Sequence, residues 1–169
     1  MMWGDIMNIF SDTLKRNNYY AKAEIRGSME FPNLAGVVYF YPVANGTLVR
    51  AEITGLPAAN MPCGEEIFGF HIHEGDSCTG DAEDPFKNTG GHYNPKNCPH
   101  PAHAGDMPPL FGNNGIAWCA FYTDRFTPDE VVGKTVIIHD KADDFKTQPS
   151  GDAGTKIACG KIVRNYLSF

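Results

Sequence analysis

The stretch AGVVYFYPVANGTLVRAEITGL, residues 35–56, decides the fold class because it contains two short extended runs joined by a tight turn. The runs span residues 35–42 and 46–56. Between them, Asn45 and Gly46 form an Asn-Gly step, which is a strong hairpin signal when apolar runs flank it. The stretch therefore predicts a β-hairpin of two antiparallel strands.

The rest of the chain repeats this pattern of short extended runs. Glycine (18 residues) and proline (12 residues) are frequent and the apolar segments are short, which favours many strands over long helices. A length of 169 residues fits one domain with a substantial core. We therefore expect an all-β sandwich or barrel with antiparallel pairing. The further predicted strands are residues 21–27, 67–74, 115–124, 134–140 and 157–165.

Outside these strands, the sequence predicts two helical segments and two long loops. An extension, residues 1–19, precedes the main domain, residues 20–169. Residues 127–130, Thr-Pro-Asp-Glu, have the cap residue, the early proline and the glutamate that are typical of a helix start. Residues 75–114 and 140–156 are loops, and loops of this length are usually functional or disordered. Helical spacing in the extension gives an apolar stripe that we expect to pack on its own domain: Trp3, Ile6, Met7, Phe10 and Leu14.

The charge and the apolar runs exclude two classes of partner. The net charge is −6 and no cluster of lysine or arginine offers a basic surface, so we expect no nucleic-acid partner. No apolar run approaches the ~20 residues of a membrane-spanning helix, so we expect no membrane span. Asp5 and Asn8 interrupt the apolar residues of the N-terminus, and this lack of a secretion signal favours the cytoplasm.

The sequence GFHIHEG, residues 69–75, places two histidines one residue apart in a predicted strand. Side chains alternate between the two faces of a strand, so Phe70 and Ile72 face the core while His71 and His73 share the opposite face. At the usual rise per residue the two imidazoles are roughly 7 Å apart, close enough to reach one cation. The alternative is that both are ordinary polar residues on the solvent face of the strand.

Three of the four remaining histidines lie in the first predicted loop, and the fourth lies just before the second. The segment GGHYNPKNCPHPAHAGD, residues 90–106, holds His92, His100, His103 and Asp106, and His139 ends a later strand. Imidazoles with a carboxylate suit zinc, and an all-imidazole set also suits copper. Two four-coordinate sites need eight ligands, whereas six histidines and one aspartate supply seven. Either one imidazole serves both metals or water fills an open position. Solvated loop histidines are the alternative.

Taken together, the motifs GFHIHE, GGHYNP, HAGD, VIIHDKADD and GTKIACG, in this order over residues 20–165, resemble the Cu,Zn superoxide dismutase family. The resemblance implies a Greek-key β-sandwich or flattened barrel of about eight antiparallel strands, with copper and zinc as cofactors. It also implies dismutation of superoxide: one superoxide is oxidised to dioxygen and a second is reduced to hydrogen peroxide. A homodimer is left open.

The resemblance also assigns roles to individual residues. The copper ligands are His71, His73, His92 and His139, and the zinc ligands are His92, His100, His103 and Asp106. His92 is thus the shared ligand. In family members this histidine dissociates from copper and takes up a proton during the reaction. Asp143 links His71 to His100 from behind the metals, whereas its neighbour Asp144 is the better candidate for a surface acid.

Five cysteines cannot all pair within one chain. The resemblance implies a disulfide between Cys78 and Cys159, which favours an oxidising compartment and opposes the cytoplasmic indication. Cys98 is either free or a spare zinc ligand, because it lies two residues before His100. Cys63 and Cys119 are expected to behave as small apolar side chains.

Two departures from the family pattern concern rate and zinc binding. Lys156 stands where the family places an arginine beside the copper channel, so the positive charge is kept but the planar fork is lost. The spacing His100-Pro101-Ala102-His103 is also tighter than in many members, which shortens the zinc loop.

Two other functions remain open. The first is a copper- and zinc-binding or chaperone-like member of the family without activity. The second is a zinc hydrolase, because His71-x-His73 followed by Asp76 superficially resembles a metallo-β-lactamase motif; Gly75, however, stands where that motif needs its aspartate.

Overall fold

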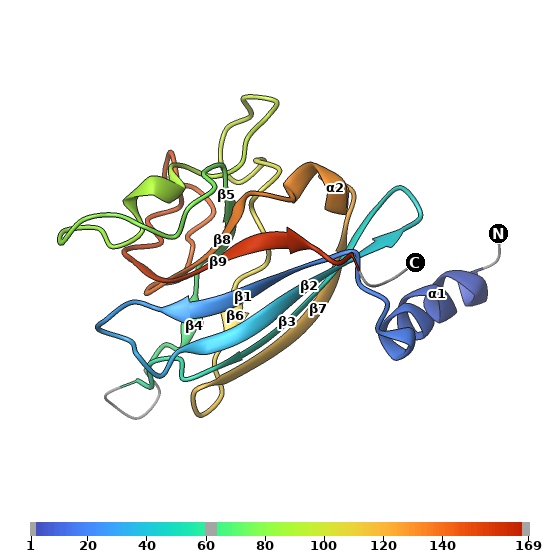
Figure 1. The fold of residues 1–169 in the computed structure, drawn as a ribbon, viewed down its shortest axis with the longest axis horizontal. Coiled ribbons are helices and arrows are strands. Elements are labelled where there is room, and N and C mark those ends of the chain that lie inside the picture. The colour runs from blue at the N-terminus through green and yellow to red at the C-terminus, as the bar shows by residue number, and fades with distance from the viewer. Residues whose placement is uncertain (1–2, 60–63, 167–169) are drawn as a thin grey trace.

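A computed structural model describes residues 3–59 and 64–166, with side chains from Ile9 onward. Its centre is a curled antiparallel sheet with the strand order β5-β8-β9-β1-β2-β3-β7 (Figure 1). The strands are β1 (Ala21–Gly27), β2 (Ala35–Val43), β3 (Gly46–Thr54), β5 (Phe70–His73), β7 (Ile116–Thr123), β8 (Thr135–His139) and β9 (Lys156–Arg164). A small second sheet pairs β4 (Ile67–Phe68) with β6 (Leu110–Phe111). The all-β prediction is confirmed.

The hairpin predicted from residues 35–56 forms between β2 and β3. Ala44 and Asn45 make the turn, while Gly46 already belongs to β3 and pairs with Val43. Gly46 is needed for a packing reason, since a Cβ atom at this position would collide with the carbonyl oxygen of Thr123. The hairpin and the start of its second strand at Gly46 were thus predicted correctly.

The predicted strand 67–74 is divided into β4 and β5 at Gly69. The amide of Gly69 donates to the carbonyl of Lys141 at 2.7 Å, and its carbonyl accepts from the amide of His139 at 2.8 Å. A side chain at Gly69 would lie 2.8 Å from the Cβ atom of Ala153. The break therefore lets β8 and the loop after it pack tightly against the strand that carries His71.

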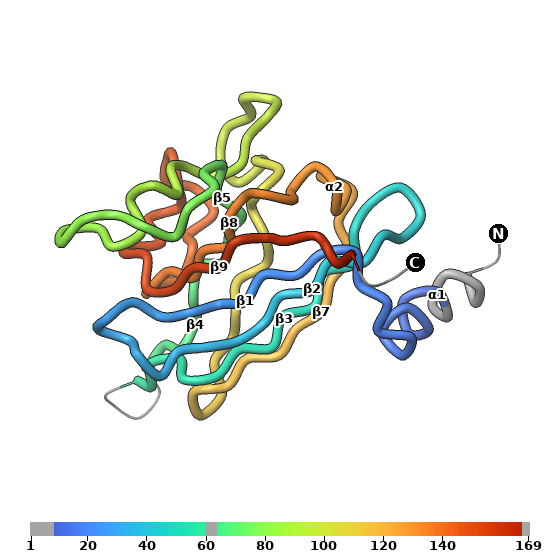
Figure 2. The backbone as a smooth tube through the Cα atoms, viewed as in Figure 1, coloured from blue at the N-terminus to red at the C-terminus, as the bar shows by residue number. Residues whose placement is uncertain are grey.

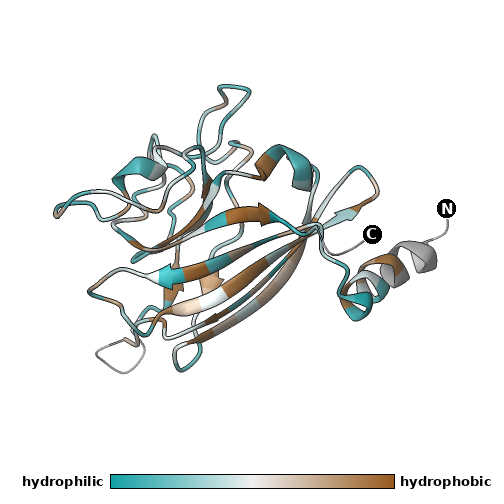
Figure 3. Cartoon of the chain, viewed as in Figure 1, coloured by the Kyte–Doolittle hydropathy of each residue, from teal (hydrophilic) through white to brown (hydrophobic). Residues whose placement is uncertain are grey.

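The core lies inside the curled sheet: burial alternates along β1, whereas every residue of β5 and β8 is buried. Fully buried examples are Ile25, Val38, Val49, Phe70 and Ile138. Figure 3 shows the hydrophobic residues on the strands and mostly hydrophilic residues in the loops at one end. Burying a side chain of this size stabilises the fold by about 1.5–3 kcal/mol each, so the barrel does not depend on metal for its core.

The N-terminal helix α1 (Trp3–Arg16) packs on the outside of the sheet, at the end away from the long loops (Figure 1). Phe10 and Leu14 contact a cluster of Tyr41, Val43 and Leu48, so this part of the predicted stripe packs on its own domain. The side chains of the remaining stripe residues lie outside the described part of the chain: Trp3, Ile6 and Met7.

The second helix, α2 (Pro128–Val131), begins at the predicted place and carries the capping box between Thr127 and Glu130. A short 3-10 helix, η1 (Lys87–Thr89), interrupts the first predicted loop. Neither this turn nor β6 was predicted from the sequence. Among the described residues, neither α1 nor α2 has the length and the apolar run that a bilayer-spanning helix needs.

The two long loops meet at one end of the sheet, beside β5 and β8 (Figure 2). Their contacts are specific: Asp143 and Gln148 of the second loop both hydrogen-bond His100 of the first loop. The histidines of the first loop are therefore brought against the histidines of the sheet.

Candidate metal centre

His71 and His73 lie on β5, and the antiparallel pairing of β5 with β8 places His139 next to them. The exposed fractions of the His71 and His73 residues are 0% and 2%, and their ring centroids are 6.4 Å apart. This burial contradicts the alternative in which the two imidazoles sit on a solvent face. The loops cover the face of β5 that would otherwise be exposed to solvent.

Four histidines bring one ring nitrogen each to a common point. The nitrogens of His71, His73, His92 and His139 all lie within 4.8 Å of one another. In each ring, one nitrogen is buried without a hydrogen-bond partner among the described residues. These atoms are Nδ1 of His71 and Nε2 of the other three. A buried polar atom without a partner is costly, and four of them converging suggest that a cation fills the space between them.

The other nitrogen of each ring has a protein partner. Nε2 of His71 lies 2.8 Å from Asp143 Oδ2, and Nδ1 of His92 lies 2.7 Å from Asp106 Oδ1. Nδ1 of His73 donates to the carbonyl of Gly90 at 2.8 Å, and Nδ1 of His139 lies 3.4 Å from the carbonyl of Gly154. Such partners fix the tautomer and the direction of a ring whose free nitrogen binds a metal.

A second group shares His92 with the first. It consists of His92, His100, His103 and Asp106, whose donor atoms also lie within 4.8 Å of one another. Oδ2 of Asp106 is 3.1 Å from Nδ1 of His100, and Oδ1 is 3.3 Å from Nδ1 of His103. Three imidazoles and one carboxylate are a donor set suited to tetrahedral zinc. All three histidines are buried, which contradicts the alternative of solvated loop histidines.

Asp143 connects the two groups. Its Oδ2 atom lies 2.8 Å from Nε2 of His71 and its Oδ1 atom lies 2.9 Å from Nε2 of His100. Gly151 makes room for this carboxylate: its φ is +71°, and a Cβ atom there would collide with both Asp143 and His100. The neighbouring Asp144 is exposed and hydrogen-bonds Thr147 within its own loop.

Burial keeps the imidazoles in the form that binds metals. It lowers the pKa of His73 well below its ordinary value. Burial, together with repulsion from His71, lowers the pKa of His139 to about 3. Burial acts to raise the pKa of Asp106, but the hydrogen bond from His92 and the neighbouring imidazoles lower it overall. His73 and His139 are therefore neutral imidazoles at neutral pH, and Asp106 is a carboxylate anion.

Lys156, the first residue of β9, lies next to the four-histidine group, because it pairs with His139 across β8 and β9. Its Nζ atom donates to Asp84 Oδ2 at 2.8 Å and lies 3.3 Å from the carbonyl oxygen of Phe86. No local sequence pattern marks this ion pair, because 72 residues separate its partners. The pair holds the ammonium group at the edge of the first loop.

A disulfide joins Cys78 of the first loop to Cys159 of β9, across a sequence separation of 81. Cys119 packs partly buried against the core, and burial raises the pKa of its thiol. Cys98 is a free thiol outside both donor groups of the described residues. Cys63 lies outside the described residues.

The hydrolase alternative fails on the position of Asp76. The side chain of this residue is 81% exposed, and its carboxylate lies 3.9 Å from the ammonium group of Lys161. It belongs to neither donor group. His71 and His73 therefore converge with other histidines and not with this aspartate.

Comparisons with known proteins agree with this arrangement. The family model for copper/zinc superoxide dismutase matches residues 34–162. A Cu-Zn superoxide dismutase of Deinococcus radiodurans is 34% identical over 145 residues, covering 75% of this chain and 76% of that protein. One of Aquifex aeolicus is 34% identical over 133 residues, covering 70% of this chain and 72% of that protein.

A more distant relative is the extracellular Cu-Zn superoxide dismutase of Mus musculus, which is 30% identical over 139 residues. The match covers 76% of this chain and 53% of the mouse protein, so the chain spans about half the length of that relative. Family membership and the two buried donor groups together support copper and zinc as the cofactors. The chain belongs to the copper/zinc superoxide dismutase family.

Proposed function

We propose that the protein dismutates superoxide, with copper held by the four-histidine group and zinc held by the group that contains Asp106. The observation that carries this proposal is the set of four buried imidazole nitrogens that converge without partners. Bound copper supplies reversible one-electron chemistry, so that two superoxide anions and two protons give one dioxygen and one hydrogen peroxide. Zinc has no redox chemistry and serves structure and tuning.

In this proposal His92 carries the proton. Its Nδ1 atom is directed to the Asp106 side and its Nε2 atom to the other three histidines. When Nε2 of His92 does not bind copper, this nitrogen holds a proton beside the four-histidine group. The remaining rings are oriented by Asp143, by the carbonyl of Gly90 and by the carbonyl of Gly154.

Lys156 provides the local positive charge that a protein of net charge −6 needs in order to attract an anion. The pair with Asp84 restrains it and offsets part of this charge. Attraction by Lys156 is therefore proposed to be weaker than that of an unpaired cation.

The test is a dismutation assay on protein whose copper and zinc contents have been measured, together with copper EPR. The proposal expects activity in proportion to bound copper and an all-nitrogen ligand field. Stoichiometric copper in that ligand field without activity would favour the alternative, a family member that binds copper and zinc but does not catalyse.

Lys156→Arg is expected to raise the dismutation rate at low ionic strength by about twofold. A guanidinium has five N–H donors, so it can keep the contacts with Asp84 and Phe86 and still offer a pair of donors to an anion. The measurement is the rate per bound copper at several salt concentrations. An unchanged rate at low salt contradicts the role given to Lys156.

Asp84→Asn is expected to raise the rate at low ionic strength by about twofold, because it removes the carboxylate that offsets Lys156. Asp81→Asn is the matched control: it removes one negative charge from the same loop, but Asp81 pairs with Lys87 and not with Lys156. The rates are compared at low salt and at about 1 M salt, where screening suppresses both effects. An equal gain in both variants would show that only the total charge matters.

A further inference from the structure

The zinc ligands other than His92 lie on one short loop without regular secondary structure, residues 99–106. Within the loop, the amide of Ala102 donates to the carbonyl of Pro99 at 2.8 Å, the amide of Asp106 to the carbonyl of His103 at 3.3 Å, and the amide of His103 to Oδ2 of Asp106 at 2.9 Å. Gly105 is bonded to Tyr93 and to Ile72 of β5, whereas these bonds leave the backbone at His100 and Pro101 without support. Two residues separate His100 from His103, so small backbone shifts would misplace their ring nitrogens. The loop needs contacts from outside to keep its donors together.

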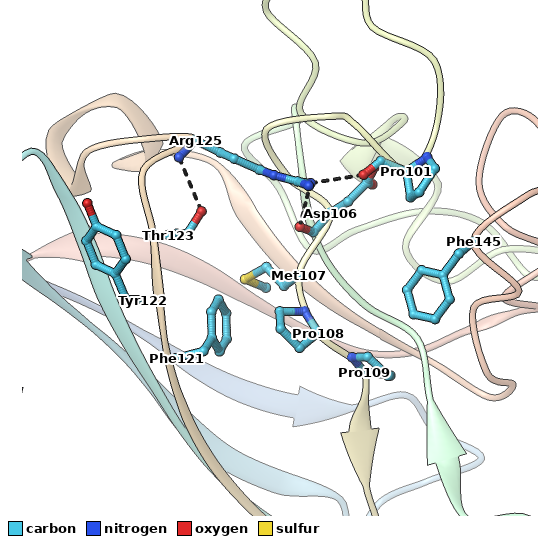
Figure 4. A pocket seen from close by; sticks show the side chains of 10 residues that line it. All are labelled: Pro101, Asp106, Met107, Pro108, Pro109, Phe121, Tyr122, Thr123, Arg125 and Phe145. Atoms are coloured by element: carbon cyan, nitrogen blue, oxygen red, sulfur yellow. Dashed lines mark hydrogen bonds between the residues drawn. The ribbon is translucent and has the colours of Figure 1, made fainter.

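Arg125, which follows β7, supplies one such contact (Figure 4). Its Nη1 atom donates to the carbonyl of Pro101 at 2.9 Å and to the carbonyl of His103 at 3.2 Å, and it lies 3.4 Å from the carbonyl of Asp106. All three carbonyls belong to the loop, and two belong to metal-group residues. A guanidinium stays charged at any physiological pH, so this contact does not depend on pH.

Gln148 supplies a second contact from the opposite loop. Its Nε2 atom donates to the carbonyl of His100 at 2.7 Å, and its Oε1 atom accepts from the amide of His100 at 3.0 Å. This pair of hydrogen bonds fixes the backbone of His100 in the way a neighbouring strand would. Arg125 and Gln148 thus restrain the loop at His100, at His103 and at Asp106.

We propose that Arg125 and Gln148 are positioning residues for the second metal group: they hold the loop backbone so that its donors converge before the metal binds. The inference deepens the proposed function, because it rests on the assignment of zinc to this group. A loop held in its binding geometry loses less conformational freedom when the metal binds, so the metal binds more tightly.

The test is titration of the disulfide-bonded, metal-stripped chain of 169 residues with Co²⁺, followed by competition with Zn²⁺. Tetrahedral cobalt gives intense visible absorption, and a His103→Ala variant identifies which band belongs to this group. Arg125→Met is expected to lower the Co²⁺ and Zn²⁺ affinities about 10-fold and to alter the band, because metal-ligand supports contribute about this much. Arg125→Lys is expected to recover part of the lost affinity. Gln148→Ala is expected to lower the Co²⁺ and Zn²⁺ affinities as Arg125→Met does.

Arg26→Met is the matched control, because Arg26 is an exposed arginine on β1, outside this contact. Wild-type affinity and spectrum in Arg125→Met overturn the proposal. The proposal is also overturned if Arg26→Met loses as much metal affinity as Arg125→Met. It is overturned as well if the affinity loss in Arg125→Met is explained by a lower melting temperature of the metal-free chain. A wild-type chain without the cobalt band overturns the zinc assignment and this inference together. A wild-type chain that shows the band and the Arg125 effect but no dismutation overturns the proposed function and supports the positioning role.

Discussion

His139→Ala is expected to abolish dismutation and to leave the fold in place. His139 belongs only to the four-histidine group, and its Nε2 atom is one of the four nitrogens that converge there. Removing the ring leaves three imidazoles, which should lower copper occupancy and destroy the four-nitrogen ligand field. The measurements are the rate per protein, copper content and copper EPR.

The fold is expected to survive because the backbone of His139 makes the structural contact. Its amide donates to the carbonyl of Gly69 at 2.8 Å, and alanine keeps this bond. Circular dichroism of the metal-free variant should therefore match the wild type.

His103→Ala is the comparison variant for this experiment. It removes an imidazole that belongs only to the second group, so all four nitrogens of the first group remain. Zinc is expected to be lost while the four-nitrogen EPR pattern persists. An active His139→Ala protein, or loss of the four-nitrogen pattern in both variants alike, would contradict the assignment of copper to the first group.

The parts of the fold that were predictable from sequence are those in which local pattern and tertiary packing agree. The run 21–27 alternates between core and surface and forms β1 over the same residues. The capping residues Thr127 and Glu130 are close in sequence, so the start of α2 could be predicted without its surroundings. By contrast, β6 has two residues and exists only because it pairs with β4. No local pattern marks such a strand.

The same distinction applies to the site. The donor residues are visible in the sequence because six histidines cluster between residues 71 and 139. Their orientation is not visible, because it depends on backbone carbonyls such as those of Gly90 and Gly154, which any residue could supply. Asp84 and Arg125 were also missed, since each acts on a residue that only the folded chain brings near. The two donor groups and the Asp143 link could therefore be predicted, whereas the other supporting contacts could not.

Cys78→Ala is expected to lower the free energy of unfolding of the metal-free chain by about 4 kcal/mol, because the disulfide closes a loop of roughly 80 residues in the unfolded chain. For a domain of this size the melting temperature should fall by about 10 °C. Cys78 is the better partner to replace. Cys159 is only 2% exposed and packs with Phe86 and Ile137, so a polar substitute there would add an unrelated cost.

The measurement is thermal and denaturant unfolding without metal, so that ligand binding does not contribute to the apparent stability. Cys98→Ala, which changes a free thiol in the same loop, is the control and should cost little. Reductant should destabilise the wild type as much as the substitution does and leave Cys78→Ala unchanged. If reductant lowers the stability of both proteins equally, the loss has another origin. The bridge also ties the loop that carries Asp84 to the strand that carries Lys156, so its reduction should weaken the salt dependence of the rate as well.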